Sequence, residues 1–234
     1  GRRVRVRLIL VLLSLTTVLS AQSELRFSAE RSSSVFAEGR ERIELTGNAR
    51  VESDEFEMTA TEISIFGEDQ RYVEANGSVT VFDRENDLYL TSESMLIDRE
   101  DDFLRARGNA YMEDRENVVV VKGELIRNWN QDDLTEISVN VRILGEDYTA
   151  RGQFARYRRS SDILELSGTP QVFWRGDEYR ADRITIDTAN DEIDFLGDVE
   201  AVVRQEDQPD DMVSGGPEPT GETTEEPTEE PDDE

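Results

Sequence analysis

The sequence of 234 residues contains no cysteine and no histidine. Without cysteine the chain has no disulfide, no thiol nucleophile and no cysteine-based zinc cluster, and it cannot carry a lipid anchor attached through an N-terminal cysteine. Without histidine it lacks the commonest general acid–base group of enzymes. The absence of disulfides is compatible with export, because proteins of this size can be stable without them. We therefore expect no metal site and no cofactor.

Basic side chains are scarce: 26 lysines and arginines stand against 54 aspartates and glutamates, for a formal net charge of −28. Four arginines lie within residues 2–7, and 13 acidic residues with no basic one follow from Gln205. Setting these aside leaves 22 basic and 41 acidic side chains in residues 22–204, a net charge of −19. A body this acidic repels phosphate backbones, so nucleic-acid binding is disfavoured. A basic partner, or solubility alone, fits the charge better.

The first 21 residues have the organisation of a secretory signal peptide. Residues 2–7 are basic, residues 8–21 form an apolar run interrupted only by serine and threonine, and a polar sequence begins at Gln22. The run is shorter than the ~20 apolar residues that a membrane-spanning helix needs. We expect export and cleavage near Ala21; retention of the segment as an uncleaved anchor is the alternative.

A short pattern recurs about every 30 residues along the chain. It reads Leu-Thr-Gly-Asn-Ala at residues 45–49 and Ala-Arg-Gly-Asn-Ala at residues 106–110. The intervals between its glycines are 30, 31, 60 and 29 residues, so one copy without glycine is expected near Ile137. Such recurrence is the signature of a repeat architecture, here with about six copies. The glycines of the pattern are Gly47, Gly77, Gly108, Gly168 and Gly197.

Apolar residues alternate with polar ones on both sides of each glycine. In the first copy they are Ile43, Leu45, Ala49 and Val51. A period of two with one apolar face predicts half-buried β-strands. Further stretches of this kind, separated by polar turn clusters, complete each copy, and no window shows sustained helical periodicity. The sequence predicts an all-β body of about six 30-residue hairpin repeats.

The repeated glycines have a consequence for the shape of the sheet. A glycine inside a strand marks a bulge, a bend or a close backbone approach, and one per repeat would bend every strand at the same height. Stacked bends would fold the sheet into a V with an apolar interior. Turn glycines between separate hairpins are the alternative, which fits less well because the alternation continues in phase across each glycine.

One folded domain is expected over residues 22–204. Residues 205–234 consist largely of Pro, Gly, Thr, Glu and Asp, a composition that cannot bury enough apolar surface to fold. We expect an acidic disordered tail over that range. A docking segment for a basic partner is the alternative.

Adjacent carboxylates are frequent, as in Asp101-Asp102 and Asp132-Asp133. Such pairs can serve in glycoside hydrolysis or calcium binding. Nearly all of them lie in the polar turn clusters, where solvated carboxylates are the ordinary expectation. We therefore expect no enzymatic activity.

Three stretches, residues 45–66, 107–126 and 179–187, resemble the OstA-like family, the family of the lipopolysaccharide-transport protein LptA. The resemblance spreads over roughly residues 25–203. It implies a V-shaped antiparallel β-jellyroll (a β-taco) whose interior carries acyl chains, and a periplasmic location. It also implies transfer of lipopolysaccharide from an inner-membrane complex to an outer-membrane assembly protein, with domains joined end to end through their open sheet edges.

The resemblance favours a lipid groove, whereas the residues alone favour a closed core. We expect a non-enzymatic carrier of a lipid A-type or other acylated lipid that serves outer-membrane assembly. Its expected partners are other OstA-like domains of the inner-membrane complex and the outer-membrane assembly protein, or further copies of itself stacked head to tail. The candidate groove residues are Ile43, Leu45, Val51, Ile63, Ile65, Val79, Val81, Ala110, Met112, Val139 and Val141.

Two other functions stay open at this point. One is a structural β-repeat protein of the envelope with a closed core and no lipid. The other is a membrane-anchored partner of the LptC type, which would require the N-terminal segment to be retained. The chain departs from the family pattern in its acidic tail, its negative body and its fourth repeat, which lacks glycine; the tail puts head-to-tail stacking in doubt, and the charge suits anionic lipid only with divalent cations.

Overall fold

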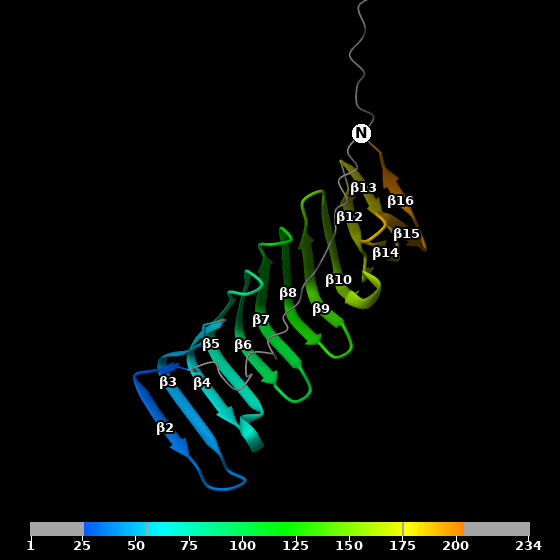
Figure 1. Cartoon of the computed structure of the whole chain (residues 1–234). Helices are drawn as coiled ribbons and strands as arrows, with labels where there is room; N and C mark the ends of the chain where they lie inside the picture. The colour runs from blue at the N-terminus through cyan, green and yellow to red at the C-terminus, as the bar shows by residue number, and fades with distance from the viewer. Residues whose placement is uncertain (1–25, 55, 175, 204–234) are drawn as a thin grey trace, which may run out of the picture. The chain divides into compact units, whose positions relative to one another are not determined.

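The computed structural model describes residues 26–54, 56–174 and 176–203 (Figure 1). The predicted signal segment, residues 1–21, and the predicted tail, residues 205–234, lie outside the described residues. Within these ranges no helix is long and apolar enough to cross a membrane. Two short 3₁₀ helices, η2 (Glu68–Gln70) and η3 (Arg159–Ser161), lie in turns. The strands are β1 (Arg26–Ser28), β2 (Arg31–Val35), β3 (Arg42–Glu52), β4 (Phe56–Phe66), β5 (Tyr72–Asp83), β6 (Leu88–Asp98), β7 (Phe103–Asp114), β8 (Val119–Trp129), β9 (Leu134–Leu144), β10 (Tyr148–Arg158), β11 (Ile163–Ser167), β12 (Gln171–Trp174), β13 (Asp177–Arg180), β14 (Arg183–Asp187), β15 (Glu192–Leu196) and β16 (Glu200–Val202).

All 16 strands belong to one antiparallel sheet. From β3 to β10 each strand pairs with its neighbours in the chain, so hairpin follows hairpin in sequence order. At both ends the long strands are interrupted: β1 and β2 both pair with β3, and β11 and β12 both pair with β10. In each case two short strands, pairing with successive parts of the same neighbour, take the place of one long strand. The all-β, antiparallel architecture predicted from the sequence is confirmed.

The repeated glycines lie at breaks in strand register. Between β3 and β4, Thr46 pairs with Glu62 and Ala49 with Ala60, so two residues, Gly47 and Asn48, stand opposite Thr61 alone. Both have left-handed backbone, with φ of +79° and +45°. An extra residue on one strand is a β-bulge, which bends that strand and increases its twist. The same left-handed pair recurs at Gly77–Ser78, Gly108–Asn109 and Gly168–Thr169, whereas Gly197 (φ +96°) stands alone between β15 and β16.

Glycine is required at these positions by space as well as by backbone conformation. A Cβ on Gly108 would lie 2.5 Å from the Oε2 atom and 2.6 Å from the Cβ atom of Glu93, the residue opposite it on β6. The positive φ of 82° adds a penalty for any other residue. Each bulge therefore brings two strands closer than a side chain would permit.

The fourth repeat places its bulge at Val139, not at Ile137. Val139 (φ +65°) and Asn140 (φ +54°) form the left-handed pair of β9. Ile137 is fully buried, whereas Val139 is 48% exposed. The predicted groove role of Val139 was therefore wrong, because Val139 occupies the glycine position and points away from the core. The error arose because a period-two pattern can be displaced by two residues without changing which residues are apolar.

Strands without a left-handed pair bend in a different way. In β4 the inward residues are Met58 and Ala60, then Ile63 and Ile65, so two successive residues between them face outward. The inward phase thus changes at the bend, opposite the bulge of the neighbouring strand. β6, β8 and β10 show the same change of phase.

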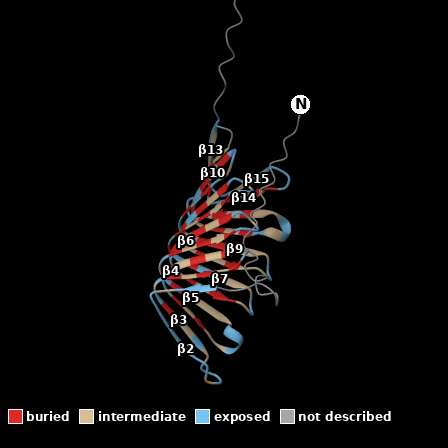
Figure 2. Ribbon diagram, turned by 60° about the vertical axis from the view of Figure 1, so that its left-hand side comes forward, coloured by how far each residue is buried: buried red, intermediate tan, exposed pale blue. Residues whose placement is uncertain are grey.

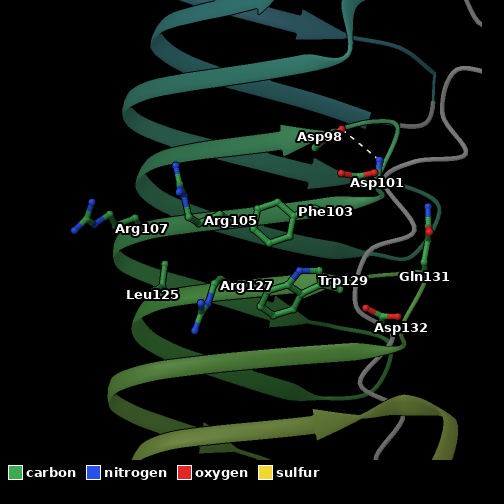
Figure 3. Close-up of a pocket in the computed structure, with 10 residues that line it drawn as sticks. All are labelled: Asp98, Asp101, Phe103, Arg105, Arg107, Leu125, Arg127, Trp129, Gln131 and Asp132. Atoms are coloured by element: carbon green, nitrogen blue, oxygen red, sulfur yellow. Dashed lines mark hydrogen bonds between the residues drawn. The ribbon is translucent and has the colours of Figure 1, made fainter.

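The inward residues of all these strands form one hydrophobic cluster (Figure 2). Buried positions run as a continuous band across neighbouring strands from β3 to β14. The described residues contain no second layer of structure over this face. The sheet therefore folds over at the bends, and its two halves, the arms, cover each other's apolar side chains. Figure 3 shows the strands of the central repeats curving through the bend. This places an apolar interior along the whole row of repeats.

Hydrogen bonds between successive turns hold one margin of the folded sheet in register. The first residue of a turn donates its backbone N–H to a carbonyl of the preceding turn, once per repeat. Each such bond contributes on the order of 1 kcal/mol. The four bonds are Arg99 N to Arg71 O (2.9 Å), Asn130 N to Asp102 O (3.0 Å), Arg159 N to Asp133 O (2.8 Å) and Thr188 N to Asp162 O (2.9 Å).

Candidate functional site

The interior of the folded sheet is the first candidate site, because most of the predicted groove residues lie there. Ile43 is partly buried and packs against the core. Val139 is the exception described above. The buried members of the set, each at most 4% exposed, are Leu45, Val51, Ile63, Ile65, Val79, Val81, Ala110, Met112 and Val141.

Sequence reasoning missed the inward residues on the first halves of β4, β6, β8 and β10, the strands without the left-handed pair. Met58, Leu90, Val121 and Ala150 all belong to the core cluster. Their phase is opposite to that of the second halves of the same strands. The signal that could have found them is the outward doublet at each bend, such as Thr61-Glu62 on β4.

Tyr148, at the start of β10, brings a polar group into this interior. Its side chain is buried and stacks on Trp174, with ring centroids 6.0 Å apart. Its hydroxyl is shielded from solvent and has no hydrogen-bond partner among the described residues. Burial raises the pKa of Tyr148, because the phenolate would be desolvated. Tyr157, on the same strand, instead donates its hydroxyl hydrogen to Asp162 Oδ1 at 3.0 Å.

A hollow of about 740 Å³ lies at the β2–β3 end of the body, where the interior reaches the surface. Two inner-face residues, Ile43 and Ile65, line it together with the exposed Val35 and Phe36. Phe36 is 81% exposed, an unusual state for so large an apolar side chain. This hollow therefore places two inner-face residues beside exposed apolar side chains.

The rim of the hollow is rich in carboxylates. Arg42 and Arg99 are its basic residues. The carboxylates outnumber them, so the local charge is negative, as it is for the whole body. An apolar chain can enter such a mouth, whereas an anionic headgroup there needs cations to screen it. The rim carboxylates are those of Glu38, Glu41, Glu68 and Asp69.

Both ends of the sheet carry free strand edges. β2 pairs only with β3, and at the other end β15 pairs only with β14 and β16 only with β13 among the described residues. All five residues of β2 are exposed. Leu196, Val199 and Val202, at the far end, are 51–66% exposed. Such edges can accept a strand from another protein.

Carboxylates have structural roles in the turns: Asp101 and Asp133, from two of the adjacent pairs noted in the sequence, bind Arg71 at 2.8 Å and Arg159 at 2.6 Å. Asp98 accepts backbone N–H groups from Glu100 and Asp101 and also binds Arg71 at 2.6 Å. The hydrogen bond from Arg71 lowers the pKa of Asp98. No cluster of three or more carboxylates able to hold a metal occurs in residues 26–54, 56–174 or 176–203.

No family model matches the chain, and no curated protein matches it. Chains of solved structures do match it. One of them is LptH, the LptA-homologous periplasmic component of the lipopolysaccharide transport device of Pseudomonas aeruginosa. It is 11% identical, with 78% of this chain and 96% of that chain covered and a TM-score of 0.25. The likeness is one of fold alone, and the architecture of this chain follows from its own strand pairing.

Proposed function

We propose that this protein is a non-enzymatic carrier of acylated lipid of the lipopolysaccharide type in the periplasm. The observation that carries the proposal is the hollow at the β2–β3 end, where Ile43 and Ile65 of the apolar interior meet the exposed Val35 and Phe36. An acyl chain laid there would cover apolar surface that now faces water. The lipopolysaccharide class and the periplasmic location rest on the sequence resemblance of residues 45–66, 107–126 and 179–187 and on the predicted signal at residues 1–21.

The energetics of the hollow favour a hydrocarbon ligand. Each buried methylene stabilises a complex by ~0.8 kcal/mol, so six methylenes against Phe36 and Val35 would contribute roughly 5 kcal/mol before ordering costs. The carboxylates of the rim oppose an anionic headgroup. Divalent cations would bridge the two. We therefore expect binding of a phosphorylated, acylated lipid to rise with millimolar Mg²⁺ and to fall on chelation.

The free strand edges fit a carrier that hands its cargo to neighbours. Strand addition at β2 or at the β15–β16 end would align the apolar interior with that of another folded sheet. The partners expected are OstA-like domains of an inner-membrane complex and an outer-membrane assembly protein, or a second copy of this chain.

Photocrosslinking from neighbouring residues on opposite faces tests the proposal. A crosslinking amino acid at Ile65 points inward, and one at Ser64 points outward. The proposal expects lipid adducts from Ile65 and none from Ser64 in protein purified from the envelope, with mass spectrometry identifying the lipid. Adducts from both positions would indicate adsorption to the surface, and purely intramolecular adducts from Ile65 would exclude an internal lipid.

A sealed structural repeat protein is the second candidate, and the burial of the central core favours it. Val81, Ala106 and Ile126 are each completely buried, so the middle of the interior is filled by the protein's own side chains. Such a protein would copurify with no lipid, and its unfolding temperature would not change when acylated lipid is added. The anchored LptC-type alternative concerns residues outside those described and is decided by N-terminal sequencing of the exported protein.

A further inference from the structure

A second hollow, of about 720 Å³, lies on the outer face of β7 and β8 (Figure 3). Its walls come from residues that alternate with the core: Arg105 lies between the buried Leu104 and Ala106, and Arg127 lies between the buried Ile126 and Asn128. The hollow is therefore separate from the interior. Its lining consists of Asp98, Asp101, Phe103, Arg105, Arg107, Leu125, Arg127, Trp129, Gln131 and Asp132.

Three arginines gather on one side of this hollow in a chain that has 54 acidic residues. Arg105 stands directly opposite Arg127 in the β7–β8 ladder, and like charges placed so destabilise a sheet. Within the described ranges no carboxylate forms an ion pair with Arg105 or Arg107. Arg127 binds Glu136 at 2.9 Å, and its buried Nε atom has no acceptor. Unpaired guanidinium groups in an acidic protein point to an anionic ligand.

Two aromatic rings form the middle of the hollow. Phe103 and Trp129 pair across the strands, with ring centroids 5.3 Å apart and planes tilted by 45°. Figure 3 shows these rings between the arginines and the turn residues. Both rings are partly exposed, so a flat ligand with C–H groups can cover them.

Hydrogen-bonding groups lie at the opposite end from the arginines. Gln131 and Asp132 are exposed and offer an amide and a carboxylate. Asp98 and Asp101 share the single guanidinium of Arg71, at 2.6 and 2.8 Å, with Glu100. This end therefore accepts hydrogen bonds from hydroxyl groups and keeps a negative charge, so the anionic group of a ligand belongs at the arginine end.

We propose that this outer hollow binds an anionic saccharide. The carboxylate or phosphate of the sugar binds Arg105 and Arg107, the ring stacks on Phe103 and Trp129, and hydroxyl groups donate hydrogen bonds to Asp132. An acidic peptide fits less well, because its successive carboxylates would also lie beside Asp132, where a saccharide presents neutral hydroxyl donors. The sugar is either free or the headgroup of a lipid, and the site is independent of the acyl-chain interior.

Fluorescence of Trp129 reports occupancy directly. Trp174→Phe leaves Trp129 as the single tryptophan, since the chain has two. Titration of this full-length variant with digalacturonate is expected to change the emission. The neutral dimethyl ester of the same disaccharide is expected to bind at least about tenfold more weakly, as is digalacturonate to the Arg105→Gln/Arg107→Gln variant, because each removes charge-assisted hydrogen bonds.

A matched control separates a site from general charge. Arg142 and Arg151 also stand opposite each other, on β9 and β10, and line neither hollow. Arg142→Gln/Arg151→Gln removes the same charge and is expected to leave the affinity within about twofold. An equal loss in this control, equal binding of the dimethyl ester, or equal binding of succinate would each overturn the proposal.

Phosphatidylcholine vesicles containing glucuronosyl diacylglycerol distinguish the two sources of the sugar. Vesicle binding that Arg105→Gln/Arg107→Gln weakens, and that free digalacturonate competes, assigns a lipid headgroup. Binding of the free disaccharide without vesicle binding assigns a free saccharide. Vesicle binding that is insensitive to those two substitutions, together with no response to the free disaccharide, would reject the site. None of these outcomes depends on lipid adducts at Ile65, so this proposal and the acyl-carrier proposal fail separately.

Discussion

Replacing Tyr148 by phenylalanine is expected to stabilise the protein, which is unusual for a change in a buried side chain. The Tyr148 hydroxyl is shielded from solvent and has no hydrogen-bond partner among the described residues. Leaving such a group unsatisfied costs roughly 1–3 kcal/mol. Phenylalanine keeps the ring and its stacking on Trp174 while removing that cost. We expect the free energy of unfolding to rise by about 1–2 kcal/mol.

Tyr157→Phe is the matched control, because Tyr157 is buried on the same strand and its hydroxyl is bonded to Asp162. This change should lower the free energy of unfolding by about 1 kcal/mol, the net value of one hydrogen bond. Equilibrium unfolding in urea measures both variants, with the midpoint and slope fitted separately. The two substitutions remove the same atom, so opposite signs isolate the effect of the hydrogen-bond partner.

The pH dependence gives an independent test. Burial raises the pKa of Tyr148 above its ordinary value of 10.0, so the folded state retains this proton longer than the unfolded state. The free energy of unfolding is therefore unaffected by the ionisation of this group below pH 10. Above pH 10 the ionisation lowers it, by at most ~1.4 kcal/mol per pH unit. Tyr148→Phe should remove this part of the alkaline loss. A variant that is less stable than the parent at neutral pH, with an unchanged alkaline slope, would refute the assignment of an unpartnered hydroxyl.

Three further predictions concern the bends and the turn margin. Gly108→Val should destabilise the protein by about 2 kcal/mol or more in urea unfolding, because a left-handed β-branched residue costs roughly 1–2 kcal/mol and its Cβ would contact Glu93. At the equivalent position of the fourth repeat, Val139→Gly should change the free energy of unfolding by less than about 0.5 kcal/mol. Relief of the left-handed strain offsets the lost side-chain packing and the greater unfolded-state entropy of glycine. A loss above about 1 kcal/mol would contradict this reasoning. Asp98→Asn should destabilise by about 1 kcal/mol near neutral pH. Because Arg71 lowers the folded-state pKa of Asp98, that loss should disappear as the pH falls below the unfolded value near 3.8, which thermal unfolding across the acid range would show.

The repeat and its strands could be predicted from the sequence because period-two alternation and spaced glycines are local signals. The position of the fourth bulge could not. Ile137 and Val139 differ by one strand period, so both satisfy the apolar pattern. The two are distinguished by the left-handed backbone at Val139 and Asn140, which depends on how β9 pairs with β8 and β10. Register of this kind is a property of three strands together.

The interior was predicted only in part, because bending changes which residues face inward. On glycine strands the bulge adds a residue and the phase is kept, as in Leu45 and Ala49. On their partners no residue is added, so the phase changes between Ala60 and Ile63. The outer hollow was not predicted at all, because Arg105 and Arg127 are 22 positions apart and meet only through the β7–β8 register.

For the proposed carrier function, the filled central core determines where a lipid would first bind. Opening the sheet between its arms near Val81 or Met112 would expose side chains whose burial contributes roughly 1.5–3 kcal/mol each. At the β2–β3 end no such opening is needed, since Phe36 is already 81% exposed and Ile65 lines the hollow. Entry should therefore begin there and proceed inward as methylenes replace side-chain contacts. Lipid adducts should be most frequent from Ile65, fewer from Val81 and fewest from Met112 at short exposure to lipid, and an equal yield at all three would exclude entry from this end.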